Sequence, residues 1–219
     1  MAQRNVRLVG EVISVNVAMP RTLRRRGRDV PTGLWKRPVA GAVAVGELGL
    51  EGDLQADRRV HGGAEKAVYA YAAEDVAWWE EQLGRELGPG FFGENLTLEG
   101  VDVSGARRGE RWQIGSVALE VTEPRHPCWK LAAKVGEPGF IKRFTEAGRP
   151  GTYLRVLTEG DLVAGDEVRR RGTAGLALLS PHEEQHERHE PECEQHRVDD
   201  GATRDGDDQE DDSDDEQHS

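Results

Sequence analysis

Cysteine is scarce in this chain: Cys128 and Cys193 are the only two among 219 residues. Small secreted domains held together by disulfides have many more. Structural zinc modules need closely spaced ligands such as C-x2-C, and no such pair occurs. The cysteine content therefore argues against a disulfide framework and against a structural zinc site.

Long apolar runs are also missing. No stretch of 18 apolar residues occurs, and the first residues, "MAQRNVRLVGEV", contain no apolar run of signal-peptide length. We therefore expect a cytoplasmic protein without membrane contact.

Hydrophobic residues are nearly absent from the C-terminal part. Residues 180–219 contain 17 acidic residues and 3 arginines, a net charge of -14, whereas the whole chain carries -12 and residues 1–179 thus carry +2. Such a composition cannot bury enough apolar surface to fold alone. We expect one domain over residues 1–172 and a disordered acidic low-complexity tail over residues 173–219. The histidines of that tail have ligand-like spacing but indicate at most an adventitious metal site.

Short segments typical of β-strands dominate the remaining sequence. They are rich in valine and isoleucine and are separated by glycine-containing turns. They cover residues 6–18, 39–45, 67–72, 110–115, 116–122, 151–160 and 166–171. This pattern predicts a mainly β, barrel-rich fold. Helices are expected over residues 74–87 and 138–148, where apolar residues share one face or Pro and Gly mark the ends.

The stretch "EPRHPCWKL" places Cys128 behind two prolines, at a point where "CWKLAAKVG" can begin a helix. A helix N-terminus, Arg125, Lys130 and a protonated His126 would all favour the thiolate. A nucleophile or a soft metal ligand needs this setting. The alternative is a small buried hydrophobic residue, since cysteine is often fully buried.

Three further stretches have candidate site residues. In "ADRRVHGGAEKAVYAY", His61 and Lys66 flank a glycine pair that permits close approach of a ligand, or forms an ordinary turn. In "GFFGENLTLEG", Glu94 and Asn95 either point into a pocket or cap a turn. In "GRPGTYLRVL", glycines and a proline shape a loop that holds Arg149.

The stretch of residues 21–38 is expected to be a long basic loop between two strands. The basic run from Arg21 to Arg28 within it has no interleaved aromatic residue, so a stacking surface for nucleic acid is not supported. A solvated loop is the simplest interpretation. Binding of a cofactor phosphate or of a redox partner's acidic face is the next alternative, and nucleic acid comes third.

Five segments in a fixed order give the chain a resemblance to the MOSC domain, named for the C-terminal domain of molybdenum cofactor sulfurase. The chain is most similar to the stand-alone bacterial YiiM-like branch, although the small three-helix C-terminal domain usual in that branch is not evident here. The matching segments are "GLEGDLQADRRVHGG", "KAVYAY", "FGENLT", "GERWQIGSVALEVTEPRHPCWKL" and "GRPGTYLRVLTEG".

This resemblance implies a function and a set of site residues. Cys128 would be the thiolate ligand of molybdenum in a molybdopterin cofactor, and the protein would be an oxidoreductase that removes oxygen from N-hydroxylated bases with electrons from a separate reductase. His61 or Glu94 would hydrogen-bond the metal's oxo group or the substrate. The cofactor itself would be bound by Arg125, Lys130, Arg149, Asn95 and Lys66.

Two other roles fit the same thiol. Cys128 could carry sulfur as a persulfide received from a cysteine desulfurase, so that pyridoxal phosphate would enter only through that partner. Alternatively, the domain could store or hand over the cofactor without catalysing a reaction.

Overall fold

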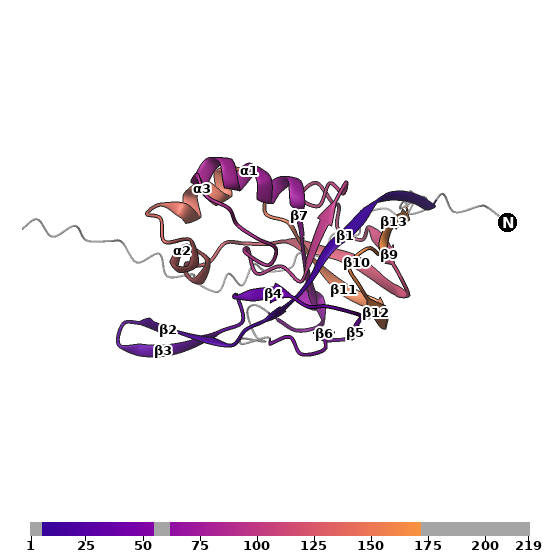
Figure 1. The fold of residues 1–219 in the computed structure, drawn as a ribbon, viewed down its shortest axis with the longest axis horizontal. Coiled ribbons are helices and arrows are strands. Elements are labelled where there is room, and N and C mark those ends of the chain that lie inside the picture. The colour runs from indigo at the N-terminus through magenta and orange to yellow at the C-terminus, as the bar shows by residue number, and fades with distance from the viewer. Residues whose placement is uncertain (1–5, 55–61, 172–219) are drawn as a thin grey trace, which may run out of the picture. The chain divides into compact units, whose positions relative to one another are not determined.

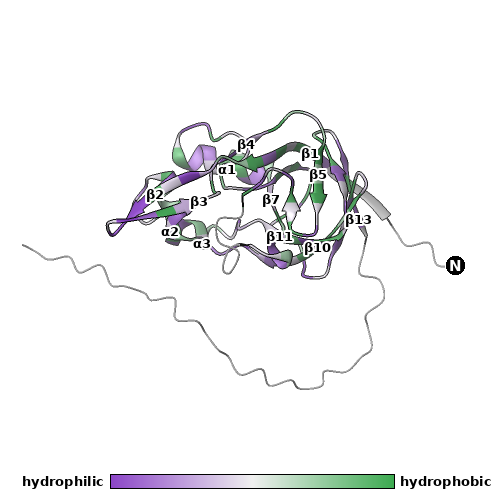
Figure 2. Ribbon diagram, turned by 90° about the horizontal axis from the view of Figure 1, so that it is seen from below, coloured by the Kyte–Doolittle hydropathy of each residue, from purple (hydrophilic) through white to green (hydrophobic). Residues whose placement is uncertain are grey.

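The computed structural model describes residues 6–54 and 62–171, and its centre is a closed β-barrel (Figures 1 and 2). Seven strands follow one another in the order β13-β9-β10-β11-β7-β8-β1, and β13 pairs with β1 to close the ring. All neighbours are antiparallel except β7 and β8. This confirms the predicted mainly β, barrel-rich fold. The barrel strands are β1 (Val6–Ala18), β7 (Val68–Ala72), β8 (Leu96–Glu99), β9 (Arg111–Ile114), β10 (Val117–Pro124), β11 (Thr152–Thr158) and β13 (Glu167–Arg171).

Shorter strands surround the barrel. β4 (Lys36–Pro38) pairs with the end of β1, and β5 (Val43–Gly46), β6 (Gly49–Leu50) and β12 (Gly160–Leu162) form a three-stranded sheet.

The basic stretch predicted to be a loop forms a β-hairpin instead. Its strands are β2 (Arg21–Arg25) and β3 (Arg28–Thr32). Arg26 and Gly27 make a two-residue turn, both with positive φ, of 49° and 75°. Two positive φ values match the right-handed twist of a hairpin. Leu23 and Val30 face each other across the ladder and are half-buried. Each strand has only one large apolar residue, Leu23 or Val30, so the sequence did not show the alternation that predicts a strand.

Three short helices lie at the hairpin end of the barrel (Figures 1 and 2): α1 (Ala73–Leu83), α2 (Trp129–Val135) and α3 (Phe140–Glu146). The prediction of a helix up to residue 87 was too long, because Gly84 takes the left-handed conformation and its N–H donates to the Glu80 carbonyl. The prediction over residues 138–148 was also longer than α3. The helix expected after Cys128 is confirmed.

Strand β7 separates two apolar cores. All five of its residues are buried, and they alternate between the two sides. Val68, Ala70 and Ala72 point into the barrel core, whereas Tyr69 and Tyr71 belong to a second core under the helices. That second core is mainly aromatic, with Trp79 stacked on Phe144 at a centroid distance of 5.7 Å. The helices thus pack on the outside of the barrel wall that also positions Tyr69.

No helix within residues 6–54 and 62–171 is long and apolar enough to cross a membrane. The predicted acidic tail, Cys193 and His61 lie outside the described residues, so the predictions about them stay predictions.

Candidate functional site

A pocket of about 90 Å³ lies between the hairpin, the start of α2 and the barrel wall. Segments from almost the whole described chain converge on it. Gly33 permits one of these approaches, because a Cβ at that position would lie 2.1 Å from the carbonyl oxygen of Leu54. The pocket is lined by Thr32, Gly33, Leu34, Lys36, Asp53, Leu54, Lys66, Ala67, Tyr69, Gly93, Asn95, Arg125, Cys128, Lys130 and Tyr153.

Cys128 lies at the N-cap position of α2, in extended conformation, and is half-buried in the pocket wall. Its carbonyl accepts the N–H of Leu131 at 3.0 Å, which begins the helix. The prolines before it leave this residue at the boundary between β10 and α2. The sequence prediction for its position is therefore confirmed.

Arg125 brings a buried positive charge to the same pocket. Its side chain donates to the carbonyl of Phe92, and its Cζ lies 4.8 Å from the ring centroid of Tyr69. Burial opposes the charge, but Tyr69, Tyr153 and Cys128 outweigh it and hold the pKa of Arg125 above its usual value. Among the described residues no carboxylate forms an ion pair with this guanidinium. A buried cation of this kind favours an anion beside it, and the Cys128 thiolate in the same pocket is a candidate.

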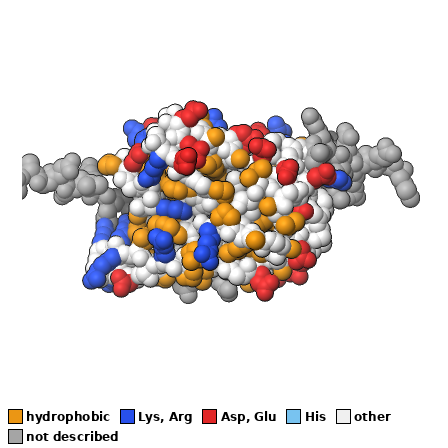
Figure 3. Space-filling view, viewed as in Figure 1, with side chains coloured by type: hydrophobic (Ala, Val, Ile, Leu, Met, Phe, Trp, Pro, Cys, Tyr) orange, Lys and Arg blue, Asp and Glu red, His pale blue; other side chains and the backbone are white. Residues whose placement is uncertain are grey.

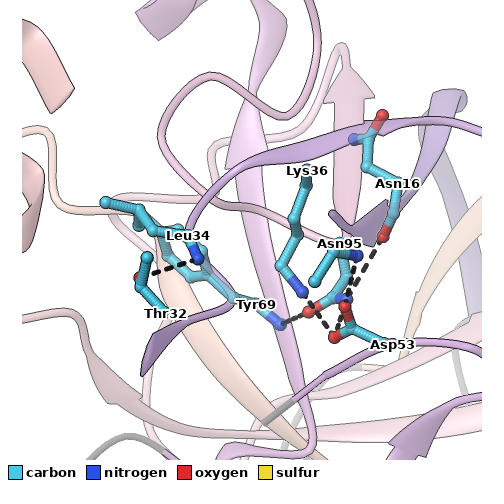
Figure 4. Close-up of polar contacts among 8 residues, drawn as sticks. Asn16, Thr32, Leu34, Lys36, Asp53, Tyr69 and Asn95 are labelled. Carbon is cyan, nitrogen blue, oxygen red and sulfur yellow. Dashed lines mark hydrogen bonds and ion pairs between the residues drawn. The ribbon is translucent and has the colours of Figure 1, made fainter. Parts of the chain in front are cut away.

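Asn95 and Asp53 hold together one wall of the pocket (Figure 4). The Asn95 side-chain amide donates to Asp53 Oδ2 at 2.8 Å, and its Oδ1 accepts the N–H of Tyr69 at 3.1 Å. Lys36 pairs with the same Asp53 carboxylate, and both side chains are over 90% buried. Burial lowers the pKa of Lys36, although Asp53 opposes this effect. Asn95 therefore positions the wall, in addition to lining it.

Positive charge dominates the pocket lining. Among the described residues that line it there is one carboxylate, Asp53, and there are four cations: Lys36, Lys66, Arg125 and Lys130. Lys66 also forms an ion pair of 2.8 Å with Glu123, which is outside the lining, and Lys130 Nζ donates to the carbonyl of Pro31 at 3.2 Å. The excess of cations suits an anionic ligand.

Glu94 lies behind this lining and is completely buried. Its Oε1 accepts hydrogen bonds from the Gly90 N–H and from Thr97 Oγ1, whereas Oε2 has no hydrogen-bond partner among the described residues. Burial raises the pKa of Glu94, opposed by these hydrogen bonds and by Lys134. Lys134 Nζ donates to the carbonyls of Leu34 and Gly90, both at 3.1 Å. This geometry gives Glu94 no direct contact with the pocket.

The buried Lys134 makes stability depend on pH. Burial lowers its pKa from 10.5 to about 8 in the folded protein, although Glu94 opposes this effect. Between these two values the unfolded chain binds more protons at this lysine, so the contribution of Lys134 to the free energy of unfolding should rise as pH increases from about 8 to 10.5. A Lys134→Met variant should lack this contribution. The free energy of unfolding of wild type should therefore increase by roughly 2 kcal/mol relative to that of the variant across this pH range. Urea unfolding at several pH values measures the difference; parallel curves would contradict the prediction.

The structure does not bring all predicted site residues together. Cys128, Arg125, Lys130, Asn95 and Lys66 line the pocket. Arg149 does not: its guanidinium pairs with Asp75 and stacks on Trp78 at 4.9 Å, beside α1. Sequence reasoning missed Lys36, Asp53 and Tyr69, although the last two lie within segments that match the family.

Fold and site together define a β-barrel domain that presents a single thiol in a pocket with excess positive charge. The MOSC domain model matches residues 57–169, which is more than half of the chain. The chain is 39% identical to the uncharacterized protein YflK of Bacillus subtilis over 169 residues. These aligned residues cover 76% of each chain. The crystal structure of YiiM from Geobacillus stearothermophilus matches with a TM-score of 0.60 and 35% identity over 74% of both chains. The chain belongs to the MOSC domain family.

Two other relatives are matched over a smaller share of their length. Protein YiiM of Escherichia coli is 31% identical over 138 residues, 61% of either chain. A protein of Gibberella moniliformis named "Reductase" is 33% identical over 146 residues, which are 65% of this chain but 26% of the fungal protein. MOSC domains are associated with molybdenum cofactor binding.

The residues present fit such a cofactor. Thiolate is a soft ligand of the kind that molybdenum takes from a pterin dithiolene, and the surrounding cations suit an anionic cofactor. The volume of about 90 Å³ is below the roughly 300 Å³ of a typical small-molecule site, so the pocket would enclose only part of the cofactor.

Proposed function

We propose that this protein binds a molybdenum–molybdopterin cofactor through Cys128 and reduces N-hydroxylated bases or related compounds. The observation that carries the proposal is the buried guanidinium of Arg125, which has no carboxylate partner among the described residues and lies in the same pocket as Cys128. A charge so placed is stabilised by a thiolate and by the anionic group that the thiolate ligates. The name of the fungal relative is consistent with reduction.

The protein's own residues would bind and orient. Cys128 supplies the metal ligand, and the charge of Arg125 keeps it ionised. Lys66 and Lys130 offer positive charge to the cofactor phosphate. The buried pair of Lys36 and Asp53 stabilises one wall of the pocket. The bound cofactor would supply the two-electron redox chemistry.

The reaction balances as a two-electron reduction. The N–O bond of the substrate breaks, two electrons and two protons are consumed, and the amine and one water molecule are formed. The electrons come from a separate reductase, which the sequence also predicts. Glu94 stands too deep in the fold to contact a substrate directly, so we assign it no proton transfer.

The test is cofactor content followed by activity. Protein produced in a host that makes molybdopterin should contain close to one molybdenum per chain and release a fluorescent pterin on oxidation. With dithionite-reduced methyl viologen as donor it should convert 6-N-hydroxylaminopurine to adenine. Cofactor without any reduction would favour a storage role. Metal-free protein that gains one sulfur atom in mass from a cysteine desulfurase would favour the sulfur carrier, and the proposal would be abandoned in either case.

A further inference from the structure

The β2–β3 hairpin concentrates positive charge on an exposed surface next to the pocket. Figure 3 shows the basic side chains gathered over this hairpin, and Figure 2 shows its hydrophilic tip projecting from the barrel end. The segment Arg21–Thr32 contains five exposed arginines and one carboxylate, Asp29. The arginines are Arg21, Arg24, Arg25, Arg26 and Arg28. Such a surface attracts an acidic partner.

Two features of the tip oppose its own stability. Arg25 and Arg28 lie directly opposite each other in the ladder, where like charges repel. Arg26 has a φ of 49°, in the left-handed region that Asn or Gly adopts at lower cost. Residues that break local rules without a structural gain are typical of functional sites.

The hairpin is attached to the segment that bears the thiol. Arg25 Cζ lies 4.5 Å from the ring centroid of Trp129, the residue after Cys128. Lys130 Nζ donates to the carbonyl of Pro31, and the following residues Thr32 and Gly33 line the pocket. A partner that binds the hairpin therefore lies over the start of α2 and the pocket mouth.

We propose that the β2–β3 hairpin is the docking surface for the acidic face of the protein that supplies electrons to the pocket. This inference rests on the proposed function, because a reduction needs a donor. An acidic protein suits the surface of this hairpin better than nucleic acid does. The nearby aromatic rings of Trp35 and Trp129 already make cation–π contacts with Arg21 and Arg25, so they do not offer free faces on which bases could stack.

The test uses two substitutions that improve local structure while removing charge. Arg26→Asn places a better residue at the positive φ, and Arg28→Glu puts an opposite charge across from Arg25. The double variant should therefore fold. The matched control is Arg107→Asn with Arg108→Glu, which removes the same charge from two exposed arginines before β9. The probe is flavodoxin, an acidic flavoprotein, kept reduced by NADPH and its reductase.

We expect the cofactor-loaded double variant to lose about tenfold or more of kcat/KM for flavodoxin at low ionic strength. Wild type should lose a similar factor between about 0.01 M and 1 M salt, over which the screening length falls from ~30 Å to ~3 Å. The control should behave like wild type. Reduction by methyl viologen, a small cationic donor, should be unchanged in all three proteins.

Binding of oxidised flavodoxin, followed by calorimetry at low salt, gives a second measurement that does not depend on turnover. Equal binding by wild type and the double variant would overturn the docking surface while leaving the proposed function in place. Failure of flavodoxin to bind wild type at low salt would also overturn it. Tight binding of a short DNA duplex that the double variant loses would assign the hairpin to nucleic acid instead. Absence of reduction with methyl viologen contradicts the proposed function and not the docking surface.

Discussion

Replacing Cys128 by serine should remove molybdenum from the protein and leave its fold intact. Serine is a preferred N-cap residue, so α2 should begin at Trp129 as before. Its hydroxyl is a hard, protonated oxygen at neutral pH and does not replace a soft thiolate ligand. Loss of a residue that only supports a ligand already costs 10–100-fold in metal affinity, so loss of the ligand should cost at least about 100-fold.

Cys193→Ser is the matched control, because it removes the other cysteine of the chain. Elemental analysis and pterin fluorescence should give wild-type values for this control and background values for Cys128→Ser. The thermal unfolding midpoints of all three proteins should agree within a few degrees. A Cys128→Ser protein that retains molybdenum would refute Cys128 as the ligand.

Arg125→Met should have the second largest effect. Methionine fills a similar volume without charge, so the thiolate and the anionic cofactor lose their buried cation. We expect molybdenum occupancy after dialysis to fall by about tenfold or more. The carbonyl of Phe92 also loses its donor, which should lower stability by about 1–3 kcal/mol.

The pH dependence of Cys128 alkylation distinguishes an electrostatic role of Arg125 from a purely structural one. Without Arg125 the thiol should ionise at higher pH, so the rate of reaction of cofactor-free protein with iodoacetamide should reach its midpoint at higher pH. Arg149→Met is the control, because Arg149 lies beside α1 and outside the pocket lining. Its alkylation profile should match wild type. Equal profiles for Arg125→Met and wild type would show that Arg125 only supports the fold.

The barrel was predictable from sequence because strand signals are local. Valine-rich segments between glycine turns gave most strands to within a few residues, and Pro124 and Pro127 fixed the point where Cys128 begins a helix. The hairpin was missed because its pattern rests on two apolar residues, Leu23 and Val30, and on a turn that starts with arginine instead of Asn or Gly.

The site was only partly predictable because it depends on side-chain directions that spacing does not reveal. The resemblance placed Arg149 in the pocket with Arg125, yet Arg149 turns toward Asp75. Glu94 and Asn95 are neighbours in sequence, but only Asn95 lines the pocket. The pair of Lys36 and Asp53 joins residues 17 positions apart through a tertiary contact, and no local pattern indicated it.

Closure of the barrel by β1 and β13 has a consequence for when the pocket can form. The first and last described strands pair with each other, so the ring cannot close until the chain has been synthesised through residue 171. Pocket walls come from segments between Thr32 and Tyr153 that are brought into place by this closed ring. A nascent chain that has not been synthesised through β13 therefore has no complete pocket. Under the proposed function, cofactor binding would follow closure of the ring, and a folded, cofactor-free barrel would precede the loaded protein.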